Sequence, residues 1–371
     1  MNYLYFLILA LFLSSFLVQL YYILAVHLRL RSFKPDEPDE SVQHPVSVII
    51  CARNEENNLK ENLTSILEQN YPDFEVIVVN DCSNDDTKYV LDDFAKRYPH
   101  LKIVNIAEHE RFKHGKKFAV TLGIKAAQNE HLVFTDADCQ PASENWLRRM
   151  QQHFTGGNEI VLGYSPYQRI GGLLNMLIRF ETFYTALNYF SFALTGRPYM
   201  GVGRNLSYTR SLFFRGKGFA SHMHILSGDD DLFVNQHANN DNTVIEIHAD
   251  SHVWTEPKRT LSSFFTQKLR HMGAGKAYRS SHKQMLFLQA GSAIAFYIFL
   301  IALIAFQAPW WILVSVFMVR TFVQLIVYYP IFNKLSYPDL IWWFPVMDFI
   351  YYFYLLSLNT IALFKKKARW R

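Results

Sequence analysis

The chain has only three cysteines, a small net charge and no internal repeat or low-complexity tract. The thiols of Cys51, Cys82 and Cys139 are scattered, without metal-ligand spacing, and three such thiols fit a reducing cytosol, so we assign them no chemistry. The formal net charge is +5, and the basic residues cluster beside apolar segments. This distribution favours the headgroups of a membrane and argues against nucleic acid as a partner.

Charged residues are also missing from the start of the chain. Residues 3–26 contain none, a run longer than the roughly 20 residues that a bilayer core requires. A signal peptide is the alternative, but no basic residue precedes the run, the run is too long and no small-residue cleavage site follows. We therefore expect a retained membrane anchor at residues 1–28.

A second uncharged region covers residues 284–319, with Pro309 near its middle. This pattern predicts two helices joined by a tight turn at residues 307–309, the second continuing past Arg320 to about Tyr329. A third apolar stretch, residues 340–364, is interrupted by Asp348. We expect two to three transmembrane helices in a C-terminal region of residues 284–371.

Basic residues mark the side of the membrane on which the central part of the chain lies. They follow the first apolar run and precede the second: Arg29, Arg31, Lys34, Lys268, Arg270, Lys276, Arg279 and Lys283. By the positive-inside rule, we expect a multi-pass protein of the bacterial inner membrane with a cytoplasmic central domain. The tail is basic too, although three spans would put it outside, so one apolar stretch is a candidate for a re-entrant or interfacial segment.

The central part alternates between apolar strands and amphipathic helices over residues 45–283, after a polar, proline-bearing linker at residues 29–44. Strands are expected at residues 46–51, 74–79, 101–106 and 131–135. Helices are expected after an N-cap at Asn57 and at residues 88–98 and 116–128. Alternation with short links implies an α/β fold with a mostly parallel sheet covered on both faces.

Polar clusters follow three of these strands, at residues 53–55, 81–87 and 136–138. Ligands of parallel sheets bind beyond the carboxyl ends of the strands. Asp81 is well placed to accept hydrogen bonds from a base or ribose. In an extended chain Asp136 and Asp138 face the same way, and two hard carboxylates suit Mg²⁺ or Mn²⁺ while leaving positions for phosphate oxygens.

Three further features favour the same chemistry. Lys116 opens a predicted helix, whose free N–H groups favour a diphosphate. The acids at residues 229–231 repel one another, and repulsion with partial burial raises the pKa of at least one, which suits a general base. Gln267 and Arg270 share one helix face, although a basic flank beside the membrane is the alternative.

Taken in order, these segments resemble the membrane-bound family-2 glycosyltransferases, which include ceramide glucosyltransferase and the chitin, hyaluronan and cellulose synthases. The likeness runs from about residue 45 to residue 274 and extends to the flanking spans. It implies a Rossmann-like GT-A domain and inverting transfer of a sugar from a nucleotide-sugar, expected to be a UDP-sugar, to a lipid acceptor in the membrane.

The resemblance also implies roles for individual residues. The residues implied to bind the donor are Ala52, Arg53, Asn54, Glu55, Asp81, Lys116, Asp136, Gln267 and Arg270. Asp138 and Asp136 are implied to bind the metal, and Asp230 with Asp229 to carry out catalysis. Gly203, Asn205 and His271 are implied to lie on the acceptor side. His271 stands where the family has a tryptophan, a departure that concerns the acceptor more than the chemistry.

Other interpretations stay open. A processive polysaccharide synthase needs a conduit for its polymer, for which three or four spans are too few. Intact carboxylates at Asp136, Asp138 and Asp230 argue against a non-catalytic scaffold. Residues 173–194 are expected to form a helix, either in the core or along the membrane interface, where it would guide a lipid headgroup toward Asp230.

Overall fold

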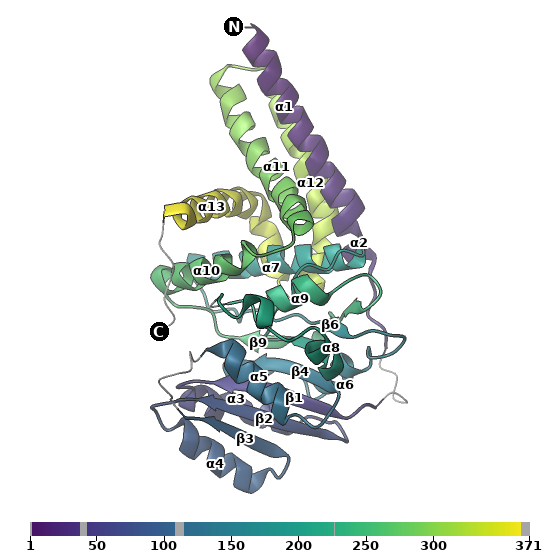
Figure 1. Ribbon diagram of the computed structural model, residues 1–371. Coiled ribbons are helices and arrows are strands. Elements are labelled where there is room, and N and C mark those ends of the chain that lie inside the picture. Colours follow the sequence, from purple (N-terminus) through teal and green to yellow (C-terminus); the bar gives the residue numbers. More distant parts are fainter. Residues whose placement is uncertain (1, 38–42, 108–114, 226, 365–371) are drawn as a thin grey trace.

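The structure is a computed structural model that describes residues 2–37, 43–107, 115–225 and 227–364. The predicted basic tail and residues 38–42 of the predicted linker lie outside these ranges. The described chain forms an α/β domain from which long apolar helices rise on one side (Figure 1).

The main sheet has seven strands in the order β3-β2-β1-β4-β7-β6-β8. Their bounds are Val46–Ala52 (β1), Phe74–Asp81 (β2), Leu101–Ile106 (β3), His131–Asp136 (β4), Ile160–Leu162 (β6), Leu206–Thr209 (β7) and Thr243–Ile245 (β8). The strands β1 to β4 are mutually parallel, whereas β7 is antiparallel to β4 and β6. The prediction of a mostly parallel sheet is confirmed, and all four predicted strands are present.

Helices cover both faces of this sheet because side chains alternate along β1. Val48 and Ile50 pack in one cluster with α3 (Glu56–Leu67) and α4 (Thr87–Arg97). Ile49 faces the other way and packs with α5 (Lys116–Ala126). All three predicted helices are therefore present, although α3 begins at Glu56 after Glu55, so the N-cap predicted at Asn57 is wrong.

Smaller elements complete the domain. They are the two-stranded sheet β5 (Cys139–Pro141) and β9 (Val253–Thr255), and the short helices α6 (Trp146–Gln151), α8 (Arg210–Arg215), α9 (Asp231–His237), η2 (Ala220–His222) and η3 (Ala249–Ser251). The strand β5 follows β4 after a single turn, so the second sheet starts beside the carboxyl ends of the main strands.

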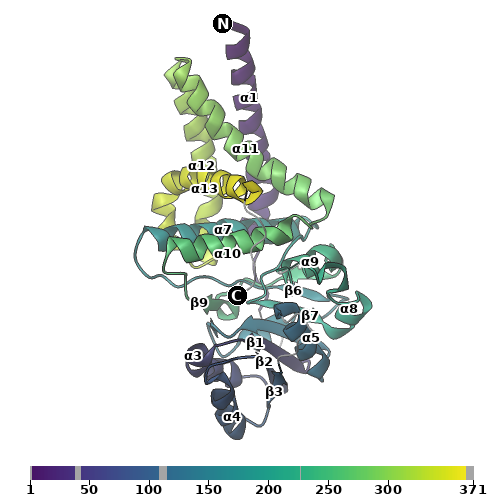
Figure 2. The ribbon, with the colours of Figure 1, turned by 60° about the vertical axis from the view of Figure 1, so that its left-hand side comes forward.

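Three helices lie crosswise between the sheet and the rising helices (Figure 2). They are α7 (Leu173–Leu194), α10 (Leu261–Gly275) and α13 (Phe344–Phe364). Most side chains of α7 are buried, and Phe183 stacks on Phe332 with ring centroids 3.6 Å apart. Of the two alternatives for residues 173–194, the structure therefore supports a core helix.

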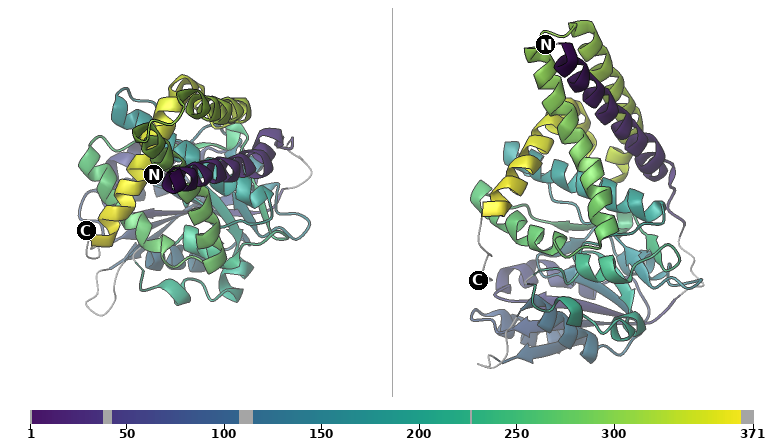
Figure 3. Two further views of the ribbon diagram at one scale, coloured as in Figure 1. Left: turned by 90° about the horizontal axis from the view of Figure 1, so that it is seen from above. Right: turned by 45° about the horizontal axis from the view of Figure 1, so that its top comes forward.

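Among the described residues, four helices are long and apolar enough to cross a membrane: Tyr3–Ser32, Ser280–Ala305, Trp310–Lys334 and Pro338–Ala362. The first consists of α1 (Asn2–Tyr21), a π-helical segment η1 (Tyr22–His27) and α2 (Leu28–Ser32). The next two are α11 and α12, and the predicted turn between them is present. The last includes η4 (Pro338–Trp343) and α13. Figure 3 shows α1, α11 and α12 rising together, whereas α13, in yellow, runs in a different direction.

A buried polar network connects these helices. Arg320 on α12 and Asp348 on α13 form an ion pair of 2.9 Å, and both side chains are 1% exposed. Arg320 also donates to Oε1 of Gln19 on α1 at 3.1 Å. The hydroxyls of Tyr297 on α11 and Tyr184 on α7 donate to Asp348. One charge pair therefore fixes five helices relative to one another.

The π-helical segment ends at a second buried contact. His27 Nδ1 lies 2.8 Å from the hydroxyl of Tyr328 on α12, and its Nε2 lies 3.2 Å from Oδ1 of Asn188 on α7. The wider turn of a π-helix holds one extra residue. The segment therefore places His27 between two other helices at the base of α1.

Candidate active site

The loops after β1 and β2 are bonded to each other at the carboxyl edge of the sheet. The amide of Asn54 donates to Oγ of Ser83 at 3.0 Å, and the amide of Glu55 donates to Oγ1 of Thr87 at 3.0 Å. The amide of Asn84 donates back to Oδ1 of Asn54 at 2.8 Å. The predicted donor loop at residues 53–55 is thus a fixed structure.

The residues that close these two strands lie beside that loop. Ala52 ends β1 and pairs with Asn80 of β2, which is followed by Asp81. Ala52 and Asp81 are both buried, at 1% and 4% exposed, whereas Arg53 is partly exposed. The structure therefore brings the predicted donor residues of the first two loops to one place.

Asp136 is the last residue of β4, and Asp138 lies in the turn before β5. The premise that both project from an extended strand is therefore wrong, because the chain turns directly after Asp136. The two carboxylates still act on one neighbour: burial raises the pKa of Glu55, and Asp138 and Asp136 raise it further. Such a gathering of carboxylates attracts a cation.

Lys116 joins two of the predicted clusters. Its Nζ lies 2.8 Å from Oδ1 of Asp136 and 3.4 Å from Oδ2 of Asp229. Burial would raise the pKa of Asp136, but the charge and hydrogen bond of Lys116 outweigh it and lower that pKa. Lys116 therefore keeps Asp136 ionised and holds it close to the acidic segment at residues 229–231.

Asp230 is fixed by two backbone amides. The N–H of Gly203 donates to its Oδ2 at 2.8 Å, and the N–H of Asp231 donates to its Oδ1 at 2.7 Å. Burial and the neighbouring Asp229 raise the pKa of Asp230. A Cβ at position 203 would lie 3.2 Å from that carboxylate, so glycine permits the close approach. A positioned carboxylate with a raised pKa can accept a proton.

Asp231 is held differently from its neighbours. The hydroxyl of Tyr278 donates to its Oδ2 at 2.8 Å. Burial and the charge of Asp230 raise the pKa of Asp231 to about 8. Asp231 is therefore mostly neutral at pH 7, and its bond to Tyr278 separates it from the pocket that Asp229 and Asp230 line.

A small pocket lies among these groups. Its charged lining consists of Lys116, Asp136, Asp229 and Asp230, and Gly203, Thr135, Tyr208 and apolar side chains complete it. Within the described ranges, no cluster of three or more His, Cys, Asp or Glu side chains could enclose a metal ion. The pair Asp136 and Asp138 nevertheless fits Mg²⁺ or Mn²⁺, because these ions often take only one or two carboxylates and complete their shell with water and phosphate oxygens.

Two of the residues predicted for the acceptor side have different surroundings. Gly203 lies in the pocket. Asn205 is fully buried, its amide donates to the carbonyls of Tyr164 and Ser251, and its Oδ1 accepts from Trp146 Nε1. The amide of Asn205 is therefore bonded inside the fold, and its assignment to the acceptor side stays a prediction.

The helix α10 carries the predicted residues Gln267, Arg270 and His271. Oγ of Ser227 donates to the carbonyl of Arg270 at 3.1 Å, which ties α10 to the segment that leads into the acids. The charge of Arg270 also lowers the pKa of Asp136, after those of Lys116 and Arg204. The side chains of Gln267 and His271 keep exposed surface. The structure thus places α10 next to the pocket.

Two residues of the site carried no predicted role. Arg204 follows Gly203 and stacks 4.5 Å from the ring of Tyr167. Its position between Gly203 and Asn205, two residues with predicted roles, was the sequence feature that could have identified it. Tyr278 had no such signal, because its contact with Asp231 joins residues far apart in sequence.

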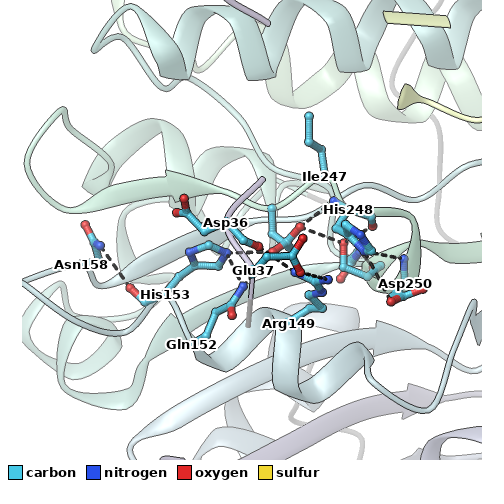
Figure 4. A network of polar contacts seen from close by, with 12 residues as sticks. Asp36, Glu37, Arg149, Gln152, His153, Asn158, Ile247, His248 and Asp250 are labelled. Atoms are coloured by element: carbon cyan, nitrogen blue, oxygen red, sulfur yellow. Dashed lines mark hydrogen bonds and ion pairs between the residues drawn. The ribbon is translucent and has the colours of Figure 1, made fainter. Parts of the chain in front are cut away.

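A second polar network lies elsewhere and does not include the residues that line the pocket (Figure 4). Arg149 Nη1 donates to the carbonyl of Asp36 at 2.7 Å, and its Nη2 lies 3.6 Å from Glu37. His153 Nε2 lies 2.8 Å from Oε2 of the buried Glu246. These contacts attach the described part of the linker to α6 and support the fold.

Residues 47–215 match the family model described as glycosyl transferase family 2. The chain is 33% identical over 120 residues to glycosyltransferase AglE of Haloferax volcanii, covering 32% of this chain and 38% of that protein. It is 33% identical over 93 residues to poly-beta-1,6-N-acetyl-D-glucosamine synthase of Staphylococcus epidermidis, covering 25% of this chain and 21% of that protein. The chain thus matches less than half the length of either relative.

One solved structure is similar over nearly the whole chain. It is the mannosyltransferase PcManGT from Pyrobaculum calidifontis in complex with GDP-Man and Mn²⁺, with a TM-score of 0.60 and 20% identity. The likeness covers 94% of this chain and 98% of that one. It confirms the predicted GT-A fold class, including the apolar helices that flank the α/β domain.

Proposed function

We propose that this chain, whose residues 47–215 match the family-2 glycosyltransferase model, moves a sugar from a nucleotide-sugar, expected to be a UDP-sugar, to a lipid acceptor embedded in the membrane. The observation that carries the proposal is the pocket at the sheet edge, where Asp230 is held by two amides beside the cluster of Lys116, Asp136 and Asp229. Such a pocket combines a proton acceptor with groups suited to a diphosphate.

Asp230 is the proposed general base. Its two oxygens are oriented by the amides of Gly203 and Asp231, and its raised pKa favours proton uptake from an acceptor hydroxyl. The hydroxyl then attacks the anomeric carbon from the side opposite the nucleotide. A single displacement without a covalent enzyme intermediate inverts that centre.

The donor is proposed to lie across the ends of β1, β2 and β4. Asp81 and the loop at residues 52–55 would hold the nucleoside, and Gln267 and Arg270 of α10 would close over the donor. Asp136 and Asp138 would hold Mg²⁺ or Mn²⁺, which when bound neutralises the charge that builds on the leaving diphosphate. The structurally similar mannosyltransferase was solved in complex with Mn²⁺, which supports the use of a divalent ion.

Lys116 is proposed to act on both sides of the reaction. Its ammonium group pairs with Asp136 and Asp229, and a third N–H remains for a diphosphate oxygen. Its charge also lowers the pKa of Asp230, against the raising effects of burial and of Asp229, and so moderates the basicity of that carboxylate.

The arrangement of the helices supports an acceptor in the membrane. Phe264 and Phe265 of α10 pack against Tyr354 of α13, and the same α10 carries Arg270 and His271 beside the pocket. A lipid headgroup that entered along α10 would therefore reach Asp230 without leaving the membrane surface. The crosswise α7 and α13 extend this layer (Figure 2).

We propose that α1, α11 and α12 cross the membrane and that α13 lies along its surface. Three crossings place the end of α13 on the same side as the α/β domain, which agrees with the basic residues that follow α1 and precede α11. The domain would then face the cytoplasm of a bacterial cell, with the helices in the inner membrane.

The polysaccharide synthase of Staphylococcus epidermidis among the relatives keeps a second function in view. Membranes that contain the full chain, given radiolabelled UDP-sugars and Mg²⁺ or Mn²⁺, should yield one lipid-soluble labelled product. A long water-soluble polymer would favour the synthase instead. If neither product forms and no nucleotide is released or bound, the chain is a scaffold.

A further inference from the structure

The acids at residues 229–231 and the helix α9 that follows them are bonded to the junction between α10 and α11, residues 276–279. The hydroxyl of Tyr278 donates to Oδ2 of Asp231 at 2.8 Å. The amide of Arg279, the residue before α11, donates to Oδ1 of Asn235 on α9 at 2.9 Å. The helix α9 therefore rests against the place where the chain turns up into α11.

Asn235 attaches α9 to two further segments. The residue is fully buried. Its Nδ2 donates to the carbonyl of Tyr199 at 2.7 Å and lies 2.9 Å from Nδ1 of His282, in the first turn of α11. A buried polar group that loses its hydrogen bond costs free energy, because no water replaces the lost partner. The amide of Asn235 therefore fixes α9 between the segment that leads to Gly203 and the base of α11.

Tyr278 is part of the same interface. It is only 9% exposed, and its ring meets that of Tyr199 edge to face, with ring centroids 6.2 Å apart. A buried tyrosine ring makes apolar contacts, whereas its hydroxyl requires a polar partner. That partner is the carboxyl group of Asp231, so the hydroxyl points to the acidic segment.

The contact of Tyr278 reaches Asp230 through a single residue. The side chain of Asp231 accepts the hydrogen bond of the hydroxyl, while its backbone N–H donates to Oδ1 of Asp230 at 2.7 Å. The N–H of Gly203 holds the other oxygen of Asp230 at 2.8 Å. A displacement of Asp231 would therefore reorient the carboxylate of Asp230.

We propose that Tyr278 is a positioning residue for the base: through Asp231, its hydroxyl keeps the carboxylate of Asp230 oriented toward the acceptor. This inference rests on the proposed sugar transfer, in which Asp230 takes the proton of the acceptor. A misplacement of about 1 Å can cost an enzyme about 10²-fold in rate. The junction also ends α10, which carries Arg270 of the proposed donor side. One junction thus fixes the base relative to a group that closes over the donor.

The first test measures initial rates in membranes that contain the full chain, with the radiolabelled UDP-sugar that the wild type transfers. Tyr278→Phe removes only the hydroxyl and should lower kcat about tenfold, with an unchanged KM for the UDP-sugar. Asp231→Ala should cause a similar loss. The double variant should lose no more than either single variant, since both remove the same bond. Asp231→Asn keeps an oxygen that accepts the hydroxyl and should retain most of the activity.

The second test needs no substrate. Hydrogen exchange of the full chain in detergent, read by mass spectrometry, reports how firmly residues 227–236 are held. Tyr278→Phe should make these amides exchange about tenfold faster than in the wild type. Tyr98→Phe is the matched control, because it removes a hydroxyl that bonds Glu68 at the surface. It should change neither sugar transfer nor the exchange of residues 227–236.

Several results would overturn the proposal. An unchanged kcat in Tyr278→Phe contradicts it, as do additive losses in the double variant. A higher KM with an unchanged kcat would move Tyr278 to the donor side. Faster exchange throughout the α/β domain would mean that Tyr278 only supports the fold. If the wild type transfers no sugar, the proposed function is rejected, while the exchange of residues 227–236 still decides whether Tyr278 holds the acidic segment.

Discussion

At the scale of single residues, Asp230 and Asp231 are neighbours in sequence with opposite surroundings. Asp230 lines the pocket, whereas Asp231 is bonded to Tyr278. We expect Asp230→Asn to lower sugar transfer by about 10²- to 10⁴-fold and to leave nucleotide-sugar affinity unchanged, because only proton uptake is lost. Initial rates and donor titrations measure both quantities.

Asp231→Asn is the matched control. Because Asp231 is mostly neutral at pH 7, an amide resembles its native state, and transfer should stay within a few-fold of the wild type. Equal losses in the two variants would show that the acidic segment acts only through its fold.

Asp231 also makes stability depend on pH. Its ordinary pKa is 3.8, and the folded protein raises it to about 8, so folding stabilises the protonated form. This contribution is complete below pH 4, falls as the pH rises through about 8 and is lost above it. Melting temperatures of the wild type relative to Asp231→Asn should therefore decline between pH 4 and pH 8. A constant difference would contradict the raised pKa.

The residue types of the site were predictable, but their orientations were not. The acids and Lys116 stood out because charged residues after apolar strands are chemically distinctive. Asn205 and Asp138 show the limit of that argument. Whether an amide points inward depends on contacts such as that with Trp146, and whether the chain turns directly after Asp136 depends on the packing around it, both of which only tertiary structure fixes.

At the scale of elements, α10 is attached to α7 through a partly buried ion pair between Lys268 and Glu181. Lys268→Met leaves the Glu181 carboxylate without its partner and should lower the free energy of unfolding by about 1–3 kcal/mol. Limited proteolysis should then cut α10 sooner than in the wild type.

A double variant separates the pair from its surroundings. Combining Lys268→Met with Glu181→Gln should recover much of the loss, because no unpaired charge remains. Additive losses in the two single variants would mean that the pair contributes no coupling.

The strands β1 to β4 and the helices α3 to α5 followed closely from sequence because buried parallel strands appear as continuous apolar runs between short helices. The shorter strands β5 to β9 and the helices α6, α8 and α9 carry no such pattern and were not predicted. The position of α7 did not follow in the same way. Its many aromatic residues suit both a core and a membrane interface, and only its packing against Phe332 and the sheet decides between them.

At the scale of the whole molecule, the ion pair of Arg320 and Asp348 holds the crosswise α13 to the rising helices. Arg320→Met would leave a buried carboxylate uncompensated and should lower the free energy of unfolding by about 3–5 kcal/mol. Thermal unfolding in detergent should show a clear drop in melting temperature. Adding Asp348→Asn should restore part of it, and no restoration would indicate that the arginine acts through packing alone.

The number of apolar segments was predictable, but their tilt was not. Hydrophobic length shows that a helix can span a bilayer, whereas its angle depends on the helices packed against it. The sequence held one sign that an apolar segment does not span: its tail is basic, whereas three C-terminal spans would put that tail outside. The crosswise direction of α13 removes this conflict (Figure 1).

The π-helical turn at Tyr22–His27 determines which face of the N-terminal helix points toward the neighbouring helices. Shortening this turn by one residue, for example by deleting Leu24, would let the helix wind regularly and would swing everything before it by about 100° around the axis. Gln19 would then face away from Arg320, and a lipid-facing side chain would take its place. The one extra residue in the π-helical turn therefore sets the rotation of the first helix about its axis relative to its neighbours.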